Sequence, residues 1–425
     1  MLDINLIRSE PEMVRKALLK KGWDFNPQEI LSLDEKRREL RVVVEETKAK
    51  LNKLSASVPV VKKAGGDINA IFAEVKELKA QNEAKEKELK DLDEEVFQIL
   101  IALPNMPDDD LLPGEKENNK VVYTFGKKPE FTFKTKDHVE LCESLGLIDY
   151  KRAAKISGSG TWIYKGIGAQ LEWALLNYFM SEHLKEGYEM ILPPHILNYE
   201  SGFTAGQFPK FKEDVFWLEG TEPMKFLLPT SETALVNLHR DEILKEEELP
   251  KKYFAYTPCY RKEAGSYRTE ERGMIRGYQF NKVEMFQYTK AEESHKAFEE
   301  MVVHAQKLVE KLGLHFQVSK LAAGDCSHGM ARTYDIEVYI PSMGIYKEVS
   351  SVSNARDYQA RRGMARYRDN ESGQVKYLHT LNGSGLATSR LIPAIVEQFQ
   401  QEDGSVVVPE VLRPFLGVSV LHIKD

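Results

Sequence analysis

The sequence predicts an α+β protein, with an N-terminal antiparallel α-helical coiled-coil arm and a larger body built on a mainly antiparallel β-sheet flanked by helices. Three observations predict this fold. The first hundred residues repeat apolar side chains at heptad spacing, a segment rich in Pro and Asp follows, and the remaining chain alternates short strand-like runs with helices. We expect a helical domain at residues 1–103, a linker at 104–114 and a body at 115–425.

The helical domain carries two heptad runs, at residues 30–58 and 68–99. Pro59 predicts a break after the first run, and the Gly-Gly-Asp sequence at 65–67 predicts a turn. The two helices are therefore expected to pair as an antiparallel hairpin. A helix of about 33 residues is roughly 50 Å long, so the hairpin should project as an arm.

Two interpretations of this arm stay open. A dimerisation coiled coil is the simpler one for an isolated pair of heptad helices. The first helix, however, is basic where the second is predominantly acidic; its basic residues are Lys36, Arg37, Arg38, Arg41, Lys48, Lys50 and Lys53. One basic side suits contact with phosphates, although a solvated charged face would have a similar pattern.

Composition limits the class of protein. No apolar run approaches the ~20 residues of a membrane span, and no signal peptide is expected at the start. Cys142, Cys259 and Cys326 lie far apart, which argues against a disulfide framework or a four-cysteine zinc site and fits a reducing cytoplasm. The net charge of −7 argues against a nucleic-acid partner, but a local basic face can bind phosphate on an acidic protein.

In the body, alternating apolar and polar residues predict strands at 189–192, 253–256, 279–287 and 334–340, with helices at 168–184 and 290–312. Neither a GxxxxGK[ST] sequence nor a strand-linked GxGxxG sequence occurs, so no P-loop or Rossmann site is indicated.

The first motif with chemical potential is a strand hairpin with a long polar connection, at residues 260–284. Arg261 and Arg276 lie near opposite ends of this connection, where both guanidinium groups can converge on one anion. Taken alone, such an Arg-rich loop is more often a surface feature with weak ion pairs.

Two further motifs follow. Residues 346–354 place a carboxylate and several hydroxyl groups on one strand, and such oxygen atoms suit Mg²⁺ held against phosphates. Residues 381–390 predict a Gly-rich turn that opens a helix, with Arg390 in its second turn. A polar strand face and an ordinary turn are the simpler explanations of each motif. The three motifs in one α+β body favour a nucleotide site.

In this order, the motifs resemble motifs 2 and 3 of class II aminoacyl-tRNA synthetases, and the bacterial-type seryl-tRNA synthetase family in particular. The arm is similar to that family's tRNA-binding coiled coil, and residues 168–194 resemble motif 1, which builds a homodimer interface. Further seryl-type sequences occur at 206–214, 237–242, 260–266, 359–362 and 401–405. The resemblance spans almost the whole chain and implies a class II synthetase catalytic domain at residues 115–425.

The resemblance implies a ligase that activates L-serine with ATP to seryl-adenylate, releases pyrophosphate, and transfers serine to the 3′ end of tRNA(Ser). Where a tRNA(Sec) is present, it is expected to be charged too. The family further implies a cytoplasmic homodimer whose arm contacts tRNA across the subunits. No membrane association is expected.

For ATP, the resemblance implies the residues Arg261, Lys262, Glu263, Arg276, Phe280, Glu348, Val349, Ser350, Ser351 and Arg390. Arg261 would bind the α-phosphate and stabilise the transition state, and Phe280 would stack on adenine. Arg276 and Arg390 would hold the β- and γ-phosphates. Arg261, Glu348 and Arg390 are the expected catalytic residues, Glu348 and Ser351 the expected Mg²⁺ ligands, and no zinc is expected.

For serine, the resemblance implies Thr230, Ser231, Glu232, Glu284 and Ser384. Carboxylates suit the α-ammonium and hydroxyl of serine, and a site that hydrogen-bonds a substrate hydroxyl rejects analogues lacking it by roughly 10⁴-fold. The chain departs from the usual family pattern at three positions, Ser231, Tyr278 and Val352, where Ala, His and Cys are common.

Two alternative functions would fit parts of the sequence. A class II paralogue that loads a carrier protein would keep the ATP site but lack the arm, so the long hairpin counts against it. A scaffold with an inactive synthetase body is disfavoured because Arg261, Glu263, Glu284, Glu348 and Arg390 are all present.

Overall fold

The computed structural model describes residues 1–65, 67–263 and 273–424. The chain divides into two compact units. The arm unit comprises Leu2–Leu19 and Trp23–Pro104, and the sheet unit comprises Met1, Lys20–Gly22 and Asn105–Asp425. In the described part of the chain, no helix is long and apolar enough to cross a membrane.

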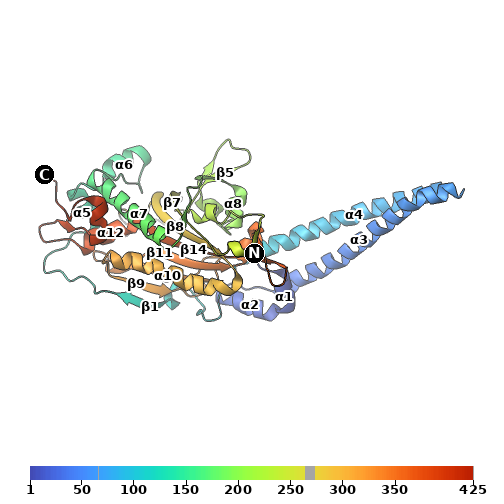
Figure 1. Ribbon diagram of the computed structural model, residues 1–425, viewed down its shortest axis with the longest axis horizontal. Coiled ribbons are helices and arrows are strands. Elements are labelled where there is room, and N and C mark those ends of the chain that lie inside the picture. Colours follow the sequence, from blue (N-terminus) through green and yellow to red (C-terminus); the bar gives the residue numbers. More distant parts are fainter. Residues whose placement is uncertain (66, 264–272, 425) are drawn as a thin grey trace. The chain divides into compact units, whose positions relative to one another are not determined.

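The arm unit is helical throughout (Figure 1). Its helices are α1 (Ile4–Ser9), α2 (Pro11–Lys20), α3 (Pro27–Lys63) and α4 (Ile68–Ala102). Helices α3 and α4 form the long antiparallel hairpin, so the predicted coiled-coil arm is confirmed. The side chains of Asn26 and Asp67 cap the starts of these two helices by accepting hydrogen bonds from backbone N–H groups of the first turn.

The predicted helix break at Pro59 is wrong, because α3 continues through this residue to Lys63. A proline inside a helix removes one backbone hydrogen bond. The apolar seam on both sides of it, at Leu54, Val58 and Val61, stays partly buried. Packing along this seam therefore holds the helix together across the missing bond.

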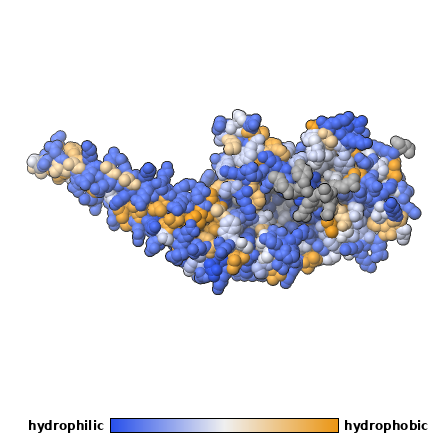
Figure 2. Space-filling view, turned by 180° about the vertical axis from the view of Figure 1, so that it is seen from behind, coloured by the Kyte–Doolittle hydropathy of each residue, from blue (hydrophilic) through white to orange (hydrophobic). Residues whose placement is uncertain are grey.

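Much of the basic cluster on α3 is engaged in ion pairs inside the arm unit. Arg37 and Arg41 both pair with Asp93 of α4. Farther along the hairpin, the Nζ–Oε distances are 3.0 Å for Lys48–Glu86 and 2.8 Å for Lys50–Glu74. Exposed pairs of this kind contribute little to stability, so phosphates can replace the carboxylates. Hydrophilic residues are spread along the whole length of the arm in Figure 2.

The sheet unit is built on one eight-stranded sheet. In spatial order its strands are β1 (Lys120–Phe125), β9 (Phe316–Lys320), β10 (Arg332–Ile340), β11 (Ile345–Arg356), β14 (His379–Ala387), β8 (Gln279–Thr289), β7 (Lys251–Tyr260) and β2 (Glu189–Met190). Every neighbouring pair is antiparallel except β7 and β2, which are parallel. The predicted mainly antiparallel sheet is confirmed.

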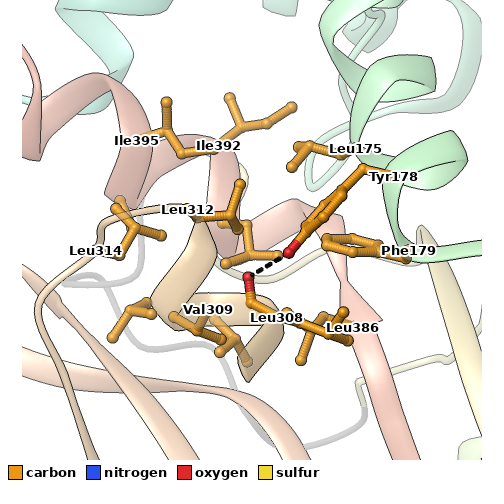
Figure 3. Packing of buried hydrophobic residues seen from close by; sticks show 14 of the residues in the cluster. Leu175, Tyr178, Phe179, Leu308, Val309, Leu312, Leu314, Leu386, Ile392 and Ile395 are labelled. Carbon is orange, nitrogen blue, oxygen red and sulfur yellow. Dashed lines mark hydrogen bonds between the residues drawn. The ribbon is translucent and has the colours of Figure 1, made fainter. Parts of the chain in front are cut away.

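Helices cover one face of this sheet and form the main core with it. They are α5 (His138–Ser144), α7 (Ile167–Lys185), α10 (Ser294–Lys311) and α12 (Thr388–Gln398). Figure 3 shows the centre of this core, where the Tyr178 hydroxyl of α7 donates a 3.1 Å hydrogen bond to the Leu308 carbonyl of α10. Val283 and Met285 of β8 point into the same core.

The opposite face of β8 carries two charged side chains, Lys282 and Glu284. Because side chains alternate along a strand, Lys282 and Glu284 share a face with Phe286 and Tyr288, and the two aromatic rings pack in a second apolar cluster. Two buried charged groups therefore lie beside apolar side chains on an interior strand of the sheet.

Smaller elements complete the sheet unit. The helices are α6 (Tyr150–Ser157), α8 (Tyr199–Thr204), α9 (Glu232–Leu235), α11 (Tyr358–Gly363) and α13 (Arg413–Leu416). The minor strands are β3 (Ile196–Asn198), β4 (Trp217–Leu218), β5 (Lys225–Leu227), β6 (Ile243–Lys245), β12 (Arg366–Arg368), β13 (Val375–Tyr377), β15 (Val406–Val407) and β16 (Val420–Leu421). Short 3₁₀ turns lie at Lys116–Asn118, Lys212–Asp214, Glu246–Glu248, Ala291–Glu293 and Glu410–Leu412.

The predicted Gly-rich turn at 381–385 is wrong, because these residues lie within β14. Helix α12 begins at Thr388, which puts Arg390 in its first turn. A Cβ atom at Gly385 would lie 2.4 Å from Cε1 of His183, and one at Gly383 would lie 3.0 Å from a methyl group of Val352. The glycines thus permit close packing against the sheet, not a turn.

Candidate active site

Two adjoining cavities open on the functional face of the sheet. The larger has a volume of about 440 Å³ and the smaller about 100 Å³. Arg261, Glu263 and Arg276 line both of them. Arg261 and Arg276, the two arginines predicted to converge, thus lie on the wall that the two cavities share. Residues 264–272 of the predicted connection lie outside the described residues.

Arg261 directly follows the end of β7 and faces Phe280 of β8. Its guanidinium carbon lies 5.3 Å from the centre of the Phe280 ring, and its Nε donates a 3.2 Å hydrogen bond to the Pro229 carbonyl. Arg276 forms an ion pair with Glu263. Backbone strands therefore position a flat aromatic ring beside two guanidinium groups, an arrangement suited to a base and its phosphates.

Arg390 enters the smaller cavity from the first turn of α12. Its Nη1 donates a 2.7 Å hydrogen bond to the backbone carbonyl of Glu348, and its Nε donates to the carbonyl of Ile275 at 3.2 Å. Glu348 and Val349 line this cavity too. Three arginines from three separate segments therefore meet there.

The two serines of the same strand are placed differently. The buried Ser350 hydroxyl donates a 2.5 Å hydrogen bond to the Ser384 carbonyl. Ser351 lies opposite Asp335 of β10, whose pKa burial and then the nearby Glu348 carboxylate raise well above its usual range. Within the described residues, neither Ser350 nor Ser351 lines either cavity.

The predicted serine-binding side chains gather where the two cavities meet. Thr230 and Glu232 line the larger cavity, and Ser384 lines the smaller. Ser384 pairs with Glu284 across β14 and β8. Lys282 forms an ion pair with the buried Glu284, and its Nζ donates a 2.7 Å hydrogen bond to the Thr230 hydroxyl. The cluster therefore combines two carboxyl groups with two hydroxyl groups.

The pKa of the Glu232 carboxyl group is far above its usual value. Burial, and then the neighbouring Glu284 carboxylate, raise its pKa to about 7. The amide of Gln359 donates a 2.7 Å hydrogen bond to Glu232 Oε1. The charge of Glu232 thus changes near neutral pH.

The Ser231 side chain turns away from this cluster. It is fully buried, and its hydroxyl lies 2.7 Å from the Thr257 hydroxyl of β7. Ser231 stands where the family usually has Ala, and Thr257 of β7 gives its additional hydroxyl group a hydrogen-bond partner. Val352, another departure, is buried in the main core.

Sequence reasoning missed the residues that hold the two carboxyl groups. These are Lys282, Gln359 and Asn382, whose Nδ2 donates to Glu284 Oε1 at 3.3 Å. A signal for Lys282 was present, because it precedes Glu284 by two residues in a largely apolar strand. Two charged residues on one face of such a strand indicate a buried polar site.

Comparison with known proteins agrees with this geometry. Residues 216–399 match the family model "tRNA synthetase class II core domain (G, H, P, S and T)", and residues 1–107 match "Seryl-tRNA synthetase N-terminal domain". A curated relative, serine–tRNA ligase 2 of Clostridium acetobutylicum, is 62% identical over 98% of this chain and 99% of its own length.

Solved structures give the same result. The seryl-tRNA synthetase from Pyrococcus horikoshii complexed with ATP has a TM-score of 0.93 and 31% identity over the full length of both chains. The cytoplasmic serine–tRNA ligase from Naegleria fowleri in complex with AMP has a TM-score of 0.87 and 27% identity, over 100% of this chain and 99% of that one.

The sheet with its arginine-lined cavity is thus a class II aminoacyl-tRNA synthetase core. Given the relative that is 62% identical over nearly the whole length, the chain belongs to the seryl-tRNA synthetase family.

Proposed function

We propose that this site activates L-serine with ATP to seryl-adenylate, releases pyrophosphate, and transfers serine to the 3′ end of tRNA(Ser). Ligation of serine to tRNA follows from membership of the family. The assignment of the steps to individual residues is the proposal. It is carried by one observation, the meeting of a carboxyl-and-hydroxyl cluster with a cavity lined by three arginines.

The arginines handle the phosphates of ATP. Arg261 stabilises the negative charge that develops on the α-phosphate as the serine carboxylate attacks it, while Arg276 and Arg390 hold the β- and γ-phosphates. Phe280 stacks on adenine, with Glu263 at the edge of the base. Catalysis then comes from the positioning of the reactants and the stabilisation of charge. No covalent enzyme intermediate is needed. The two structural relatives with bound ATP and AMP support a nucleotide at this site.

Glu232 binds the ammonium group of serine, Glu284 binds its hydroxyl group, and Thr230 and Ser384 orient the substrate. The Ser231 hydroxyl is engaged with Thr257, so Ser231 contributes to the serine site through its backbone. Alanine and glycine leave buried polar groups unpaired and are rejected by roughly 10⁴-fold. Threonine is excluded by the shape of the pocket.

Mg²⁺ is the metal that suits this site. Glu348 and Ser351 offer oxygen atoms, the donors that Mg²⁺ prefers, and Glu348 lines the smaller cavity. Mg²⁺ usually keeps several water ligands and uses substrate phosphates, so few protein ligands suffice. When bound, it neutralises phosphate charge.

A homodimer is part of the proposal. Large apolar side chains are exposed on and after α7: Trp173 (51%), Leu184 (55%) and Leu192 (74%). Such a surface favours burial against a second copy. We infer that the arm of one subunit presents tRNA(Ser), and tRNA(Sec) where it occurs, to the other subunit. The three cysteines are unpaired and buried, which suits a reducing cytoplasm.

Amino-acid-dependent ATP–pyrophosphate exchange tests the activation step. The assay compares serine, threonine, alanine and glycine, each with and without Mg²⁺. Exchange that requires Mg²⁺ and serine is the expected result. Exchange with none of the four amino acids would contradict the proposal.

A further inference from the structure

Strand β14 carries a β-bulge beside the serine cluster. Ser384 of β14 lies opposite Glu284 of β8, and the next pair joins Ala387 to Lys282. Residues 385–386 of β14 therefore face a single residue of β8. A bulge of this kind interrupts the ladder of backbone hydrogen bonds and sets the direction of nearby side chains. The direction of the Ser384 side chain, which lines the smaller cavity, thus depends on how the bulge is held.

Two side chains from different elements bind the backbone of this bulge. The Ser350 hydroxyl of β11 donates a 2.5 Å hydrogen bond to the Ser384 carbonyl. At the next residue, Nε2 of His183 in α7 lies 2.5 Å from the Gly385 carbonyl oxygen. Because a carbonyl oxygen only accepts hydrogen bonds, Nε2 carries the proton and is the donor. Glycine has the widest backbone freedom of any residue, so bonds to the peptide groups before and after Gly385 fix the most adaptable position of the bulge.

The proton on Nε2 determines the role of the other ring nitrogen of His183. Burial, and then the neighbouring His304, lower the pKa of His183 to about 3, so the ring is neutral at pH 7. A neutral imidazole with its proton on Nε2 accepts a hydrogen bond at Nδ1. His183 Nδ1 lies 2.8 Å from Nε2 of His304 in α10, which is therefore the donor. The hydrogen bonds run in one direction, from His304 to His183 and on to Gly385.

His304 is itself held in place. Its ring stacks on Tyr188, with ring centres 6.0 Å apart, and the Tyr188 hydroxyl accepts a 2.6 Å hydrogen bond from Gln287 of β8. Both histidines are buried, and buried polar rings destabilise a core unless they are hydrogen-bonded. Apolar side chains would fill the same space without that desolvation. What the histidine pair adds is a fixed hydrogen-bond donor that faces β14.

We propose that His183 is a positioning residue for serine activation, and that His304 fixes the His183 ring for this role. Through the Gly385 carbonyl, His183 holds the bulge of β14 and keeps the Ser384 side chain directed at serine. Neither histidine contacts a substrate in this assignment. The inference rests on the proposed function, because Ser384 is assigned there to orient serine.

ATP–pyrophosphate exchange tests this role through separate KM values for serine and ATP. His183→Leu removes the donor to Gly385 and should raise the KM for serine roughly 2- to 12-fold, the effect of losing one hydrogen bond to the substrate. The KM for ATP should stay near the wild-type value. His183→Gln should restore the KM for serine, because an amide can accept from His304 and donate to Gly385.

A double-mutant cycle with Ser384→Ala separates positioning from general stability. Because His183 acts through Ser384, His183→Leu should change the KM for serine much less in the Ser384→Ala background than in the wild type. His315→Leu is the matched control, since His315 is also buried and its Nδ1 lies 2.7 Å from the Phe125 carbonyl oxygen. This control should lower thermal stability without changing the KM for serine.

His304→Leu keeps the His183 ring and replaces His183→Leu in these assays if that variant does not fold. It should raise the KM for serine, and His304→Gln should restore it. Equal changes in the two KM values, additive effects in the cycle, or equal effects of His183→Leu and His315→Leu on the KM for serine would overturn the positioning role. Absence of exchange in the wild-type protein would instead overturn the proposed function.

Discussion

Glu232 is buried beside another carboxyl group, and that environment sets the pH range in which it works. Its pKa of about 7 means that it is mostly protonated at pH 6 and mostly ionised at pH 8. The ammonium of serine is attracted only by the ionised form. The KM for serine in ATP–pyrophosphate exchange should therefore fall about tenfold between pH 6 and pH 8.

Glu232→Gln is the control for this pH dependence, because its amide cannot ionise. This variant should show a higher KM for serine that no longer changes over the same pH range. A wild-type KM that is constant from pH 6 to pH 8 would contradict a role for the ionised Glu232 carboxylate.

Also at the residue scale, sequence patterns predicted the arginines that line the cavities better than the residues that support the buried carboxyl groups. The spacing of Arg261, Arg276 and Arg390 around strand-like runs pointed to a phosphate site. Lys282 and Gln359 support Glu284 and Glu232 from other segments. Their roles depend on strand pairing and on the face each side chain occupies, which short-range patterns do not define.

At the scale of elements, β14 is tightly packed against α7 at Gly385. A Cβ atom there would lie 2.4 Å from the His183 ring, whose nitrogen is already within 2.5 Å of the Gly385 carbonyl. Gly385→Ala is expected to destabilise the protein by about 1–3 kcal/mol through overpacking. Thermal unfolding measures this loss.

Gly329→Ala is the matched control for Gly385→Ala. A Cβ atom at Gly329 would meet the Tyr358 ring at 3.5 Å, an ordinary contact distance. Its effect on stability should stay within about 0.5 kcal/mol. Equal thermal stability of the two variants would show that β14 can move away from α7.

A buried carboxyl group joins three elements of the sheet unit. Glu172 of α7 accepts hydrogen bonds from Thr388 of α12, at 2.6 Å, and from Asn281 of β8, at 2.7 Å. Burial raises its pKa to about 7, so the folded protein binds this proton more tightly than the unfolded chain does. The stabilisation that Glu172 contributes is therefore fully present below its unfolded pKa and is lost as the pH rises through 7.

Urea unfolding at pH 6 and pH 8 measures this linkage. The wild-type protein should lose about 1 kcal/mol from Glu172 over this interval, and Glu172→Gln should lose less, because the amide oxygen keeps both hydrogen bonds without ionising. Glu172→Leu removes both bonds and should be destabilised at both pH values. Equal pH dependence in the wild type and Glu172→Gln would contradict the shifted pKa.

Some helices and strands can be predicted from the sequence and others cannot, for physical reasons. Heptad spacing and strand alternation are local patterns, so α3, α4, β7 and β8 were anticipated. Pro59 and the glycines of β14 were misread as breaks. Each owes its conformation to long-range packing, with the α4 seam in one case and with His183 in the other.

For the whole molecule, overall charge and local charge have different consequences. A net charge of −7 does not attract RNA, yet the arm presents Arg41 and Lys48, which are paired with the exposed carboxylates of Asp93 and Glu86. RNA phosphates can displace those carboxylates at low cost. The side chains proposed for adenylate formation, in contrast, belong to the sheet unit.

Shortening the arm should therefore separate the two half-reactions. The distance from Lys48 Nζ to Glu86 Oε1 is 3.0 Å, so these two residues face each other across the hairpin, and residues 49–85 can be replaced there by a short Gly-Ser turn. The pairs of Asp34 with Arg8 and of Asp93 with Arg41 are kept, which preserves the base of the arm. ATP–pyrophosphate exchange with serine should be unchanged. Charging of tRNA(Ser) should be lost, because the phosphate contacts of the arm are gone. Charging at the wild-type rate would show that the arm serves another purpose, such as dimerisation, and the mass of the shortened protein in light scattering would decide that directly.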